Sequence, residues 1–66
     1  MSKTYLIMEA TGTSENTMEE AIQNAIKDAG KHVKDIRWFE MIDTRGHVQD
    51  NKVSHFQVTV KIGYCG

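Results

Sequence analysis

Residues 36–64 read IRWFEMIDTRGHVQDNKVSHFQVTVKIGY, and the pattern of this stretch decides the fold. Two segments rich in β-branched and aromatic residues, Ile36–Val48 and Val53–Tyr64, are separated by Asp50 and Asn51, which are good turn formers. The stretch therefore predicts a β-hairpin. Gly46 follows Arg45 inside the first arm, and we expect a bulge or bend there because a glycine within a strand often marks one.

The hairpin turn fixes which residues face each other, because successive side chains alternate between the two sides of a strand. With Asp50 and Asn51 as the two turn residues, Trp38 faces Gly63, Phe39 faces Ile62, Met41 faces Val60 and Asp43 faces Val58. One side of the hairpin is then apolar, with Phe39, Met41, Val58, Val60 and Ile62. The other side carries Trp38, Glu40, Ile42 and Thr44 on one arm and Gln57, Thr59, Lys61 and Gly63 on the other.

Upstream of the hairpin, the sequence predicts a strand and then a helix. Residues Lys3–Ala10 favour a strand that ends in a turn at Thr11–Ser14. Apolar residues then recur with the helical period, at Met18, Ala21, Ile22, Ala25, Ile26, Ala29 and Val33. Ser14 or Thr17 is the expected N-cap, Glu20 has capping-box spacing from Thr17, and Gly30 is the expected C-cap.

These elements predict an α+β fold of the β-α-β-β type. We expect a three-stranded antiparallel sheet in the order 1-3-2, with the helix covering the apolar side of the hairpin. The 66 residues leave room for one domain, residues 1–66. A core this small is marginal by itself, and a single cysteine excludes an internal disulfide. Self-association is therefore the expected source of extra stability.

Composition narrows the class of function. The net charge of −1 argues against nucleic-acid binding and gives no attraction to anionic membranes. The apolar run at Tyr5–Met8 is too short for a signal peptide or a membrane span. With Cys65 unpaired, the reducing cytoplasm is the expected location.

The side of the hairpin that the helix leaves bare is the candidate binding surface. An indole at Trp38 offers a stacking surface, the Gln57 carboxamide offers a donor and an acceptor, and Arg45 offers a guanidinium nearby. Together they suit a planar heteroaromatic ligand. The alternative is that Trp38 simply packs in a subunit interface, because exposed aromatic residues mark interfaces as often as pockets.

Other reactive residues give weaker patterns. His47 and His55 are near neighbours across the hairpin, but two imidazoles alone are not a metal signature, so no metal site is predicted. Neither a nucleophile–base pair nor an activated cysteine is evident, and Thr11–Thr13 is better explained as a turn than as an anion site. We therefore predict no catalytic residues.

Taken together, these segments resemble the dodecin family over almost the whole chain. The similar segments are TGTS at 11–14, Ala21–Ile22, WFE at 38–40, RGH at 45–47 and HFQVTVKIGY at 55–64. Each is weak alone, but their order in a chain of this length is specific. The sequence departs from the family at its end, where Tyr64 replaces a phenylalanine and Cys65–Gly66 stands in place of a charged tail.

The resemblance implies a hollow homododecamer that binds flavin in stacked pairs at two-fold axes. It implies that Trp38 stacks on the isoalloxazine ring, that Gln57 hydrogen-bonds its polar edge, and that Arg45 borders the site as in bacterial members. FMN or riboflavin is the implied ligand, with coenzyme A as a second ligand in some members. The implied role is storage, sequestration and photochemical quenching of flavin. Two other functions remain open: a flavin-dependent redox enzyme, and a ligand-free oligomeric interaction module or RNA-binding sheet.

Overall fold

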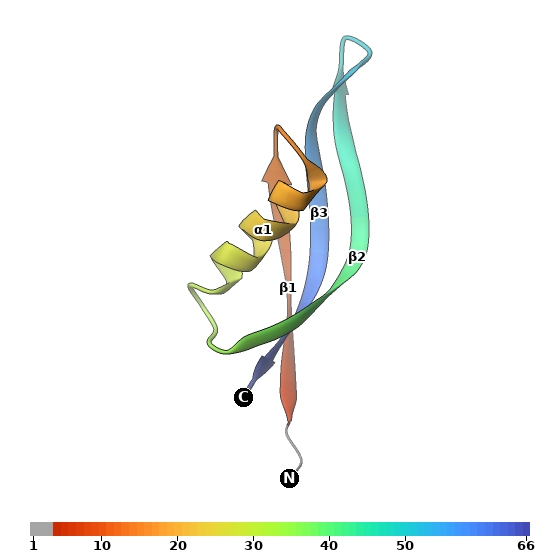
Figure 1. The fold of residues 1–66 in the computed structure, drawn as a ribbon. Helices are drawn as coiled ribbons and strands as arrows, with labels where there is room; N and C mark the ends of the chain where they lie inside the picture. The colour runs from red at the N-terminus through yellow and green to blue at the C-terminus, as the bar shows by residue number, and fades with distance from the viewer. Residues whose placement is uncertain (1–3) are drawn as a thin grey trace.

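The computed structural model describes residues 4–66 and has a β-α-β-β topology. Strand β1 (Tyr5–Ser14) is followed by helix α1 (Met18–Ala29), strand β2 (Ile36–Gln49) and strand β3 (Lys52–Cys65). The three strands form one antiparallel sheet in the order β1-β3-β2, as predicted (Figure 1). Lys3, where we expected the first strand to begin, lies outside the described residues.

The hairpin turn falls where the sequence predicts it. Asp50 and Asn51 have φ values of 54° and 62°, and Gln49 pairs with Lys52 on either side of them. Two consecutive residues with positive φ match the twist of an antiparallel pair, and Asn and Asp tolerate that conformation well. The turn therefore fixes the register at the closed end of the hairpin.

Strand β1 is longer than predicted. Thr11–Ser14, which we expected to be a turn, continues the strand and pairs with Phe56–Thr59 of β3. The reason lies on the helix side, where Gly12 lets α1 approach the strand. A Cβ at Gly12 would collide with the carbonyl oxygen of Ala21 and lie 2.6 Å from the amide nitrogen of Ala25. The glycine that suggested a turn is therefore needed because the backbones of β1 and α1 pack closely at this point.

Helix α1 begins as predicted with Thr17 as N-cap, whose hydroxyl accepts a hydrogen bond from the Glu20 amide at 3.0 Å. The reciprocal hydrogen bond of a capping box, from the Thr17 backbone amide to the Glu20 carboxylate, does not form. The Glu20 carboxylate instead accepts from the Ser14 hydroxyl at 2.5 Å and from the side-chain amide of Asn16 at 3.0 Å. These two hydrogen bonds, the one from Ser14 first, lower the pKa of Glu20 below its ordinary value of 4.5.

The core lies between the helix and two of the three strands. Its fully buried apolar residues are Ala21, Ala25, Ala29, Val58, Val60 and Ile62. Among the described residues, the backbone of α1 lies against β1 and β3 but not against β2, which adds Ile36 at the edge of the core (Figure 1). Our expectation that the helix covers the whole apolar side of the hairpin is therefore wrong for Phe39 and Met41, which remain 46% and 41% exposed. A twelve-residue helix seated closely over β1 and β3 leaves these two side chains of the outer strand uncovered.

Candidate functional site

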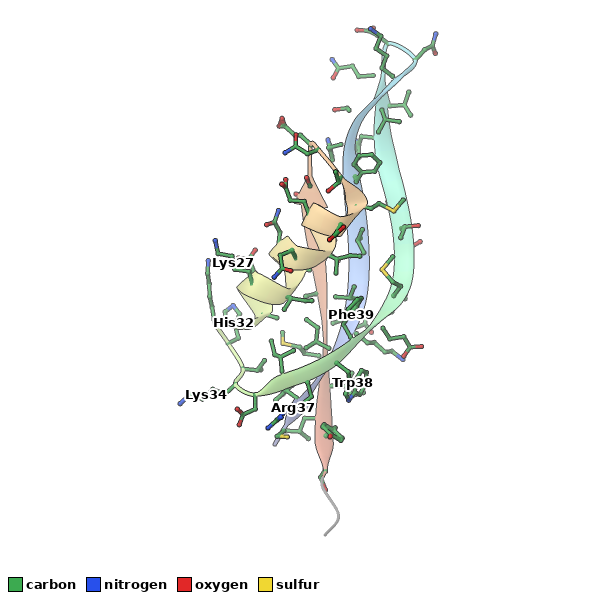
Figure 2. All side chains as sticks on the ribbon, in the orientation of Figure 1. Lys27, His32, Lys34, Arg37, Trp38 and Phe39 are labelled. Carbon is green, nitrogen blue, oxygen red and sulfur yellow. The ribbon has the colours of Figure 1, made fainter. Side chains whose placement is uncertain are left out.

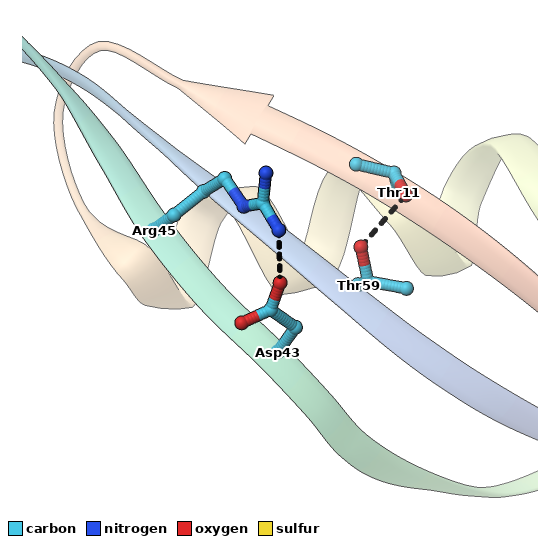
Figure 3. A network of polar contacts seen from close by, with 4 residues as sticks. All are labelled: Thr11, Asp43, Arg45 and Thr59. Atoms are coloured by element: carbon cyan, nitrogen blue, oxygen red, sulfur yellow. Dashed lines mark hydrogen bonds and ion pairs between the residues drawn. The ribbon is translucent and has the colours of Figure 1, made fainter.

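The side of the sheet opposite α1 carries the candidate binding residues. We call it the open face. Between β2 and β3 it is defined by five cross-strand pairs: Trp38 with Gly63, Glu40 with Lys61, Asp43 with Thr59, Arg45 with Gln57, and His47 with His55. Figure 3 views this face directly, with the helix behind the strands and the side chains of Arg45, Asp43, Thr11 and Thr59 in front.

A bulge in β2 corrects the predicted register. The pairing shifts by one residue between Met41 and Asp43, so Asp43 pairs with Thr59 rather than with Val58. Ile42 takes up the extra position, and Thr44 moves to the helix side opposite Val58, although we expected it on the open face.

The bulge that we expected at Gly46 is absent. Gly46 pairs regularly with Phe56, and the register shifts in β2 lie elsewhere along the strand. The shift at Ile42 is the one that matters for the site, because it places Arg45 directly opposite Gln57 on the open face.

Trp38 lies on the open face with its ring across Gly63. A Cβ at Gly63 would collide with the indole ring, so the absence of a side chain there makes room for the ring. Tyr5 of β1 meets the indole edge to face, with ring centroids 6.3 Å apart and planes at 67°. Trp38 remains 37% exposed, so the indole is held from below and from one edge but is not sealed inside the chain.

Arg45 and Gln57 form the second part of the site. Their Cα atoms are direct partners across the hairpin. The Arg45 guanidinium donates to the Asp43 carboxylate at 2.5 Å, two residues back on the same side of β2 (Figure 3). Both side chains are largely exposed, so this ion pair contributes little to stability but directs the guanidinium along the strand.

The structure separates Trp38 from the Arg45–Gln57 pair. Gly63, which lies under the indole, is six residues from Gln57 on β3. At about 3.3 Å per residue this separation is about 20 Å. Figure 2 shows Trp38 near the start of β2, far from the hairpin turn. A single planar ring cannot lie against both groups of one chain.

Two residues near the site were not predicted to belong to it. Tyr5 lies at the end of β1, and only the observed pairing of β1 with β3 brings it to the indole. Asp43 looked like a helix-side residue in the predicted register, and only the bulge brings it to Arg45. Alternation along β1 would have placed Tyr5 on the open face, but not beside Trp38.

Two negative findings concern the part of the chain that the structure describes. Residues 4–66 contain no group of three or more His, Cys, Asp or Glu side chains placed to hold a metal ion. The helix within the same range is neither long nor apolar enough to cross a membrane.

Comparisons with known proteins agree with this geometry. The family model described as Dodecin matches residues 4–65. A protein named Dodecin from Thermus thermophilus is 38% identical over 64 residues, which cover 97% of this chain and 93% of the relative.

Solved structures match over nearly their whole length as well. Dodecin from Streptomyces davaonensis superposes with a TM-score of 0.93 at 33% identity, covering 100% of this chain and 97% of that one. Dodecin from Streptomyces coelicolor gives a TM-score of 0.90 at 34% identity, covering 97% of this chain and 91% of that one. The order of strands, the open face and these matches lead to one conclusion: the chain belongs to the dodecin family.

Proposed function

We propose that this chain binds flavin, as FMN or riboflavin, between copies of itself in a hollow homododecamer, and that it stores and sequesters the flavin while quenching its photochemistry. The Trp38 indole carries the proposal. It rests on Gly63, is braced by Tyr5 and remains 37% exposed on a face that α1 leaves bare. An indole held flat and open in this way suits stacking on an isoalloxazine ring.

The Arg45–Gln57 pair supports the proposal with matching polar chemistry. The Gln57 carboxamide has a donor and an acceptor side by side, which complement the imide edge of a flavin. The Arg45 guanidinium, directed by Asp43, is available for a ring carbonyl or for the phosphate of FMN. The ligand has an aromatic plane and a polar edge, and the open face offers a partner for each.

A second copy of the chain completes the site. Within one chain the indole and Gln57 are about 20 Å apart along β3. A two-fold axis between two copies reverses the strand direction and brings Trp38 of one copy toward Gln57 of the other. The symmetry generates two equal sites, and two flavins bound there would stack on each other between the two indoles.

Exposed apolar surface on the outer strand supports self-association. Large apolar side chains of β2 and the hairpin are 41–70% exposed: Phe39, Met41, Ile42, Val48 and Val53. The buried core is small, as expected for a chain of 66 residues. Packing these side chains between copies would remove them from water and supply the stability that one chain lacks.

The proposed role is binding rather than turnover. A flavin enclosed between an indole and a second flavin has no free face for a substrate. A closely stacked indole is also a good electron donor to the excited ring, so quenching is the expected photochemical outcome. We propose a cytoplasmic protein with no nucleic-acid or membrane partner, and residues 1–66 as one dodecin-like domain. Coenzyme A, which some bacterial members also hold, is the second ligand to test.

Size-exclusion chromatography with visible absorbance tests the proposal directly. The purified protein should elute as a large particle, bind added FMN and quench its emission. Trp38→Ala should weaken FMN binding by the roughly 1–3 kcal/mol that stacking on an aromatic side chain contributes. Gln57→Ala should also weaken it, whereas Gln23→Ala on the exposed side of α1 should not. A monomer that leaves FMN emission unchanged would refute the proposal. Titration with coenzyme A in the same format tests the second ligand.

A further inference from the structure

The strongest feature outside the proposed flavin site is a pair of histidines near the closed end of the hairpin. His47 and His55 are direct partners across β2 and β3, two residues beyond the Arg45–Gln57 pair on the open face. Their rings are stacked, with centroids 4.3 Å apart and planes at 20°. The third histidine of the chain, His32, lies apart from them, beside the end of α1 (Figure 2).

We propose that His47 and His55 form a chelating site for a borderline transition-metal ion, with Cu²⁺ bound most tightly. The two imidazoles come from directly opposite positions on neighbouring strands, and the sheet holds these strands in place. Two nitrogens that bind one such ion at about 2.0–2.1 Å each lie about 3 Å apart. With the ring centroids 4.3 Å apart, binding one ion requires the rings to turn from the stacked arrangement so that one nitrogen of each points at the ion. Rotation about the broad χ2 torsion allows this without moving the backbone.

Ser54 lies close enough to one ring nitrogen of His55 to favour one tautomer. Its hydroxyl oxygen lies 3.3 Å from Nδ1 of His55. When the Nδ1–H donates to that oxygen, the lone pair lies at Nε2 and is available to a metal. Metal-bound histidines commonly use their second nitrogen in this way, which holds the tautomer and the ring orientation.

Electrostatics at the pair permit a cation. The nearest positive group along the same side of β2 is Arg45, and its charge is paired with Asp43 at 2.5 Å. The described residues place no third His, Cys, Asp or Glu in position to complete a metal cluster. The protein therefore supplies two ligands and water fills the rest. Such an open nitrogen site follows the Irving–Williams order, in which Cu²⁺ exceeds Ni²⁺ and Zn²⁺.

Titration of the flavin-free full-length protein with Cu²⁺ tests the site, with calorimetry and electron paramagnetic resonance as readouts. We expect one Cu²⁺ per chain with hyperfine coupling to two imidazole nitrogens. His47→Gln or His55→Gln should weaken binding by more than the roughly 10–100-fold that loss of a metal ligand's hydrogen-bond partner costs, and Ser54→Ala by roughly tenfold. His32→Gln is the matched control and should bind as the unaltered protein does.

Circular dichroism on each variant separates loss of the site from loss of the fold. Should a glutamine variant unfold, the unaltered protein still decides the matter through the two-nitrogen spectrum. Cu²⁺ binding that survives in folded His47→Gln and His55→Gln proteins, or a spectrum without two nitrogens, would overturn the proposal. Because no flavin is present in this experiment, its result does not affect the proposed flavin function, which has its own test.

Discussion

Strands β3 and β2 both direct apolar side chains toward the same side of the sheet, but only those of β3 are covered. Val60 and Ile62 are 0% exposed beneath α1, whereas their cross-strand partners Met41 and Phe39 are more than 40% exposed. The difference arises because the alanine stripe of α1 seats the helix closely over β1 and β3 and leaves Phe39 and Met41 of β2 uncovered. One strand is buried by its own chain, and the other is left for a second copy to cover.

The largest expected effect on stability comes from shortening a covered side chain of β3, and it is compared with shortening an uncovered side chain of β2. Ile62→Ala removes a fully buried side chain and should cost about 2–5 kcal/mol of the free energy of unfolding. Phe39→Ala removes an exposed one and should leave the fold of a single chain nearly unchanged while weakening assembly. Urea unfolding and sedimentation velocity measure the two effects separately.

Concentration dependence sharpens this comparison. Stability that depends on assembly rises with protein concentration. We expect Phe39→Ala to weaken that dependence and to give smaller particles, whereas Ile62→Ala should lower the melting temperature at every concentration. Equal effects of the two substitutions on particle size would break the distinction between a self-covered strand and a copy-covered one.

A second prediction concerns the open face. Gly63→Ala places a Cβ where the Trp38 ring now lies, so the indole must move. Loss of its stacking contribution, roughly 1–3 kcal/mol, corresponds to roughly 5- to 150-fold weaker binding of FMN. Fluorescence titration of FMN measures it. Gly30→Ala, at the right-handed C-cap of α1, is the control and should retain normal FMN affinity.

The smallest predicted effect is a pH dependence at the start of α1. Because the pKa of Glu20 is lowered in the folded chain, its carboxylate adds stability above the ordinary value of 4.5. That contribution is lost as the pH falls through the folded pKa. The melting temperature of Glu20→Gln should therefore lie below that of the unaltered protein at pH 7, and this difference should shrink as the pH falls below 4.5.

Glu19→Gln is the matched control for this prediction. Glu19 lies in the same first turn of α1 but takes no part in the network that joins Glu20 to Ser14 and Asn16. Its substitution should lower the melting temperature less at pH 7, and that difference should change less on acidification. A Glu20→Gln difference that stayed constant from pH 7 to pH 3 would contradict the assigned role of the carboxylate.

Local patterns predicted most of the fold because each depends on neighbours along the chain. The Asp50–Asn51 turn, the Thr17 cap and the alternation along β3 are all local features, and the structure confirms them. The strand order followed from the strand–helix–strand crossover, which leaves β1 and β2 running in the same direction, and from the hairpin, which returns β3 between them.

Features that depend on distant packing could not be predicted. Nothing around Ile42 signals the bulge that moves Arg45 onto the open face, since the usual glycine marker lies at Gly46, which is regular. The extension of β1 through Gly12 depends on the helix that packs over it. For the candidate site, the residues could be predicted from the sequence, but the distance between Trp38 and Gln57 became known only from the observed register of the sheet.

Co-assembly of two defective chains tests the central claim most directly, namely that one copy supplies the indole and another supplies the carboxamide. Trp38→Ala and Gln57→Ala chains, each assembled alone, should bind little FMN. In a random mixture, half of the two-fold pairs contain one chain of each kind, and each such pair holds one intact site. We expect recovery of about a quarter of the unaltered protein's FMN sites. No recovery, with mixed particles shown by mass spectrometry, would mean that both residues serve the ligand from the same chain or that neither does.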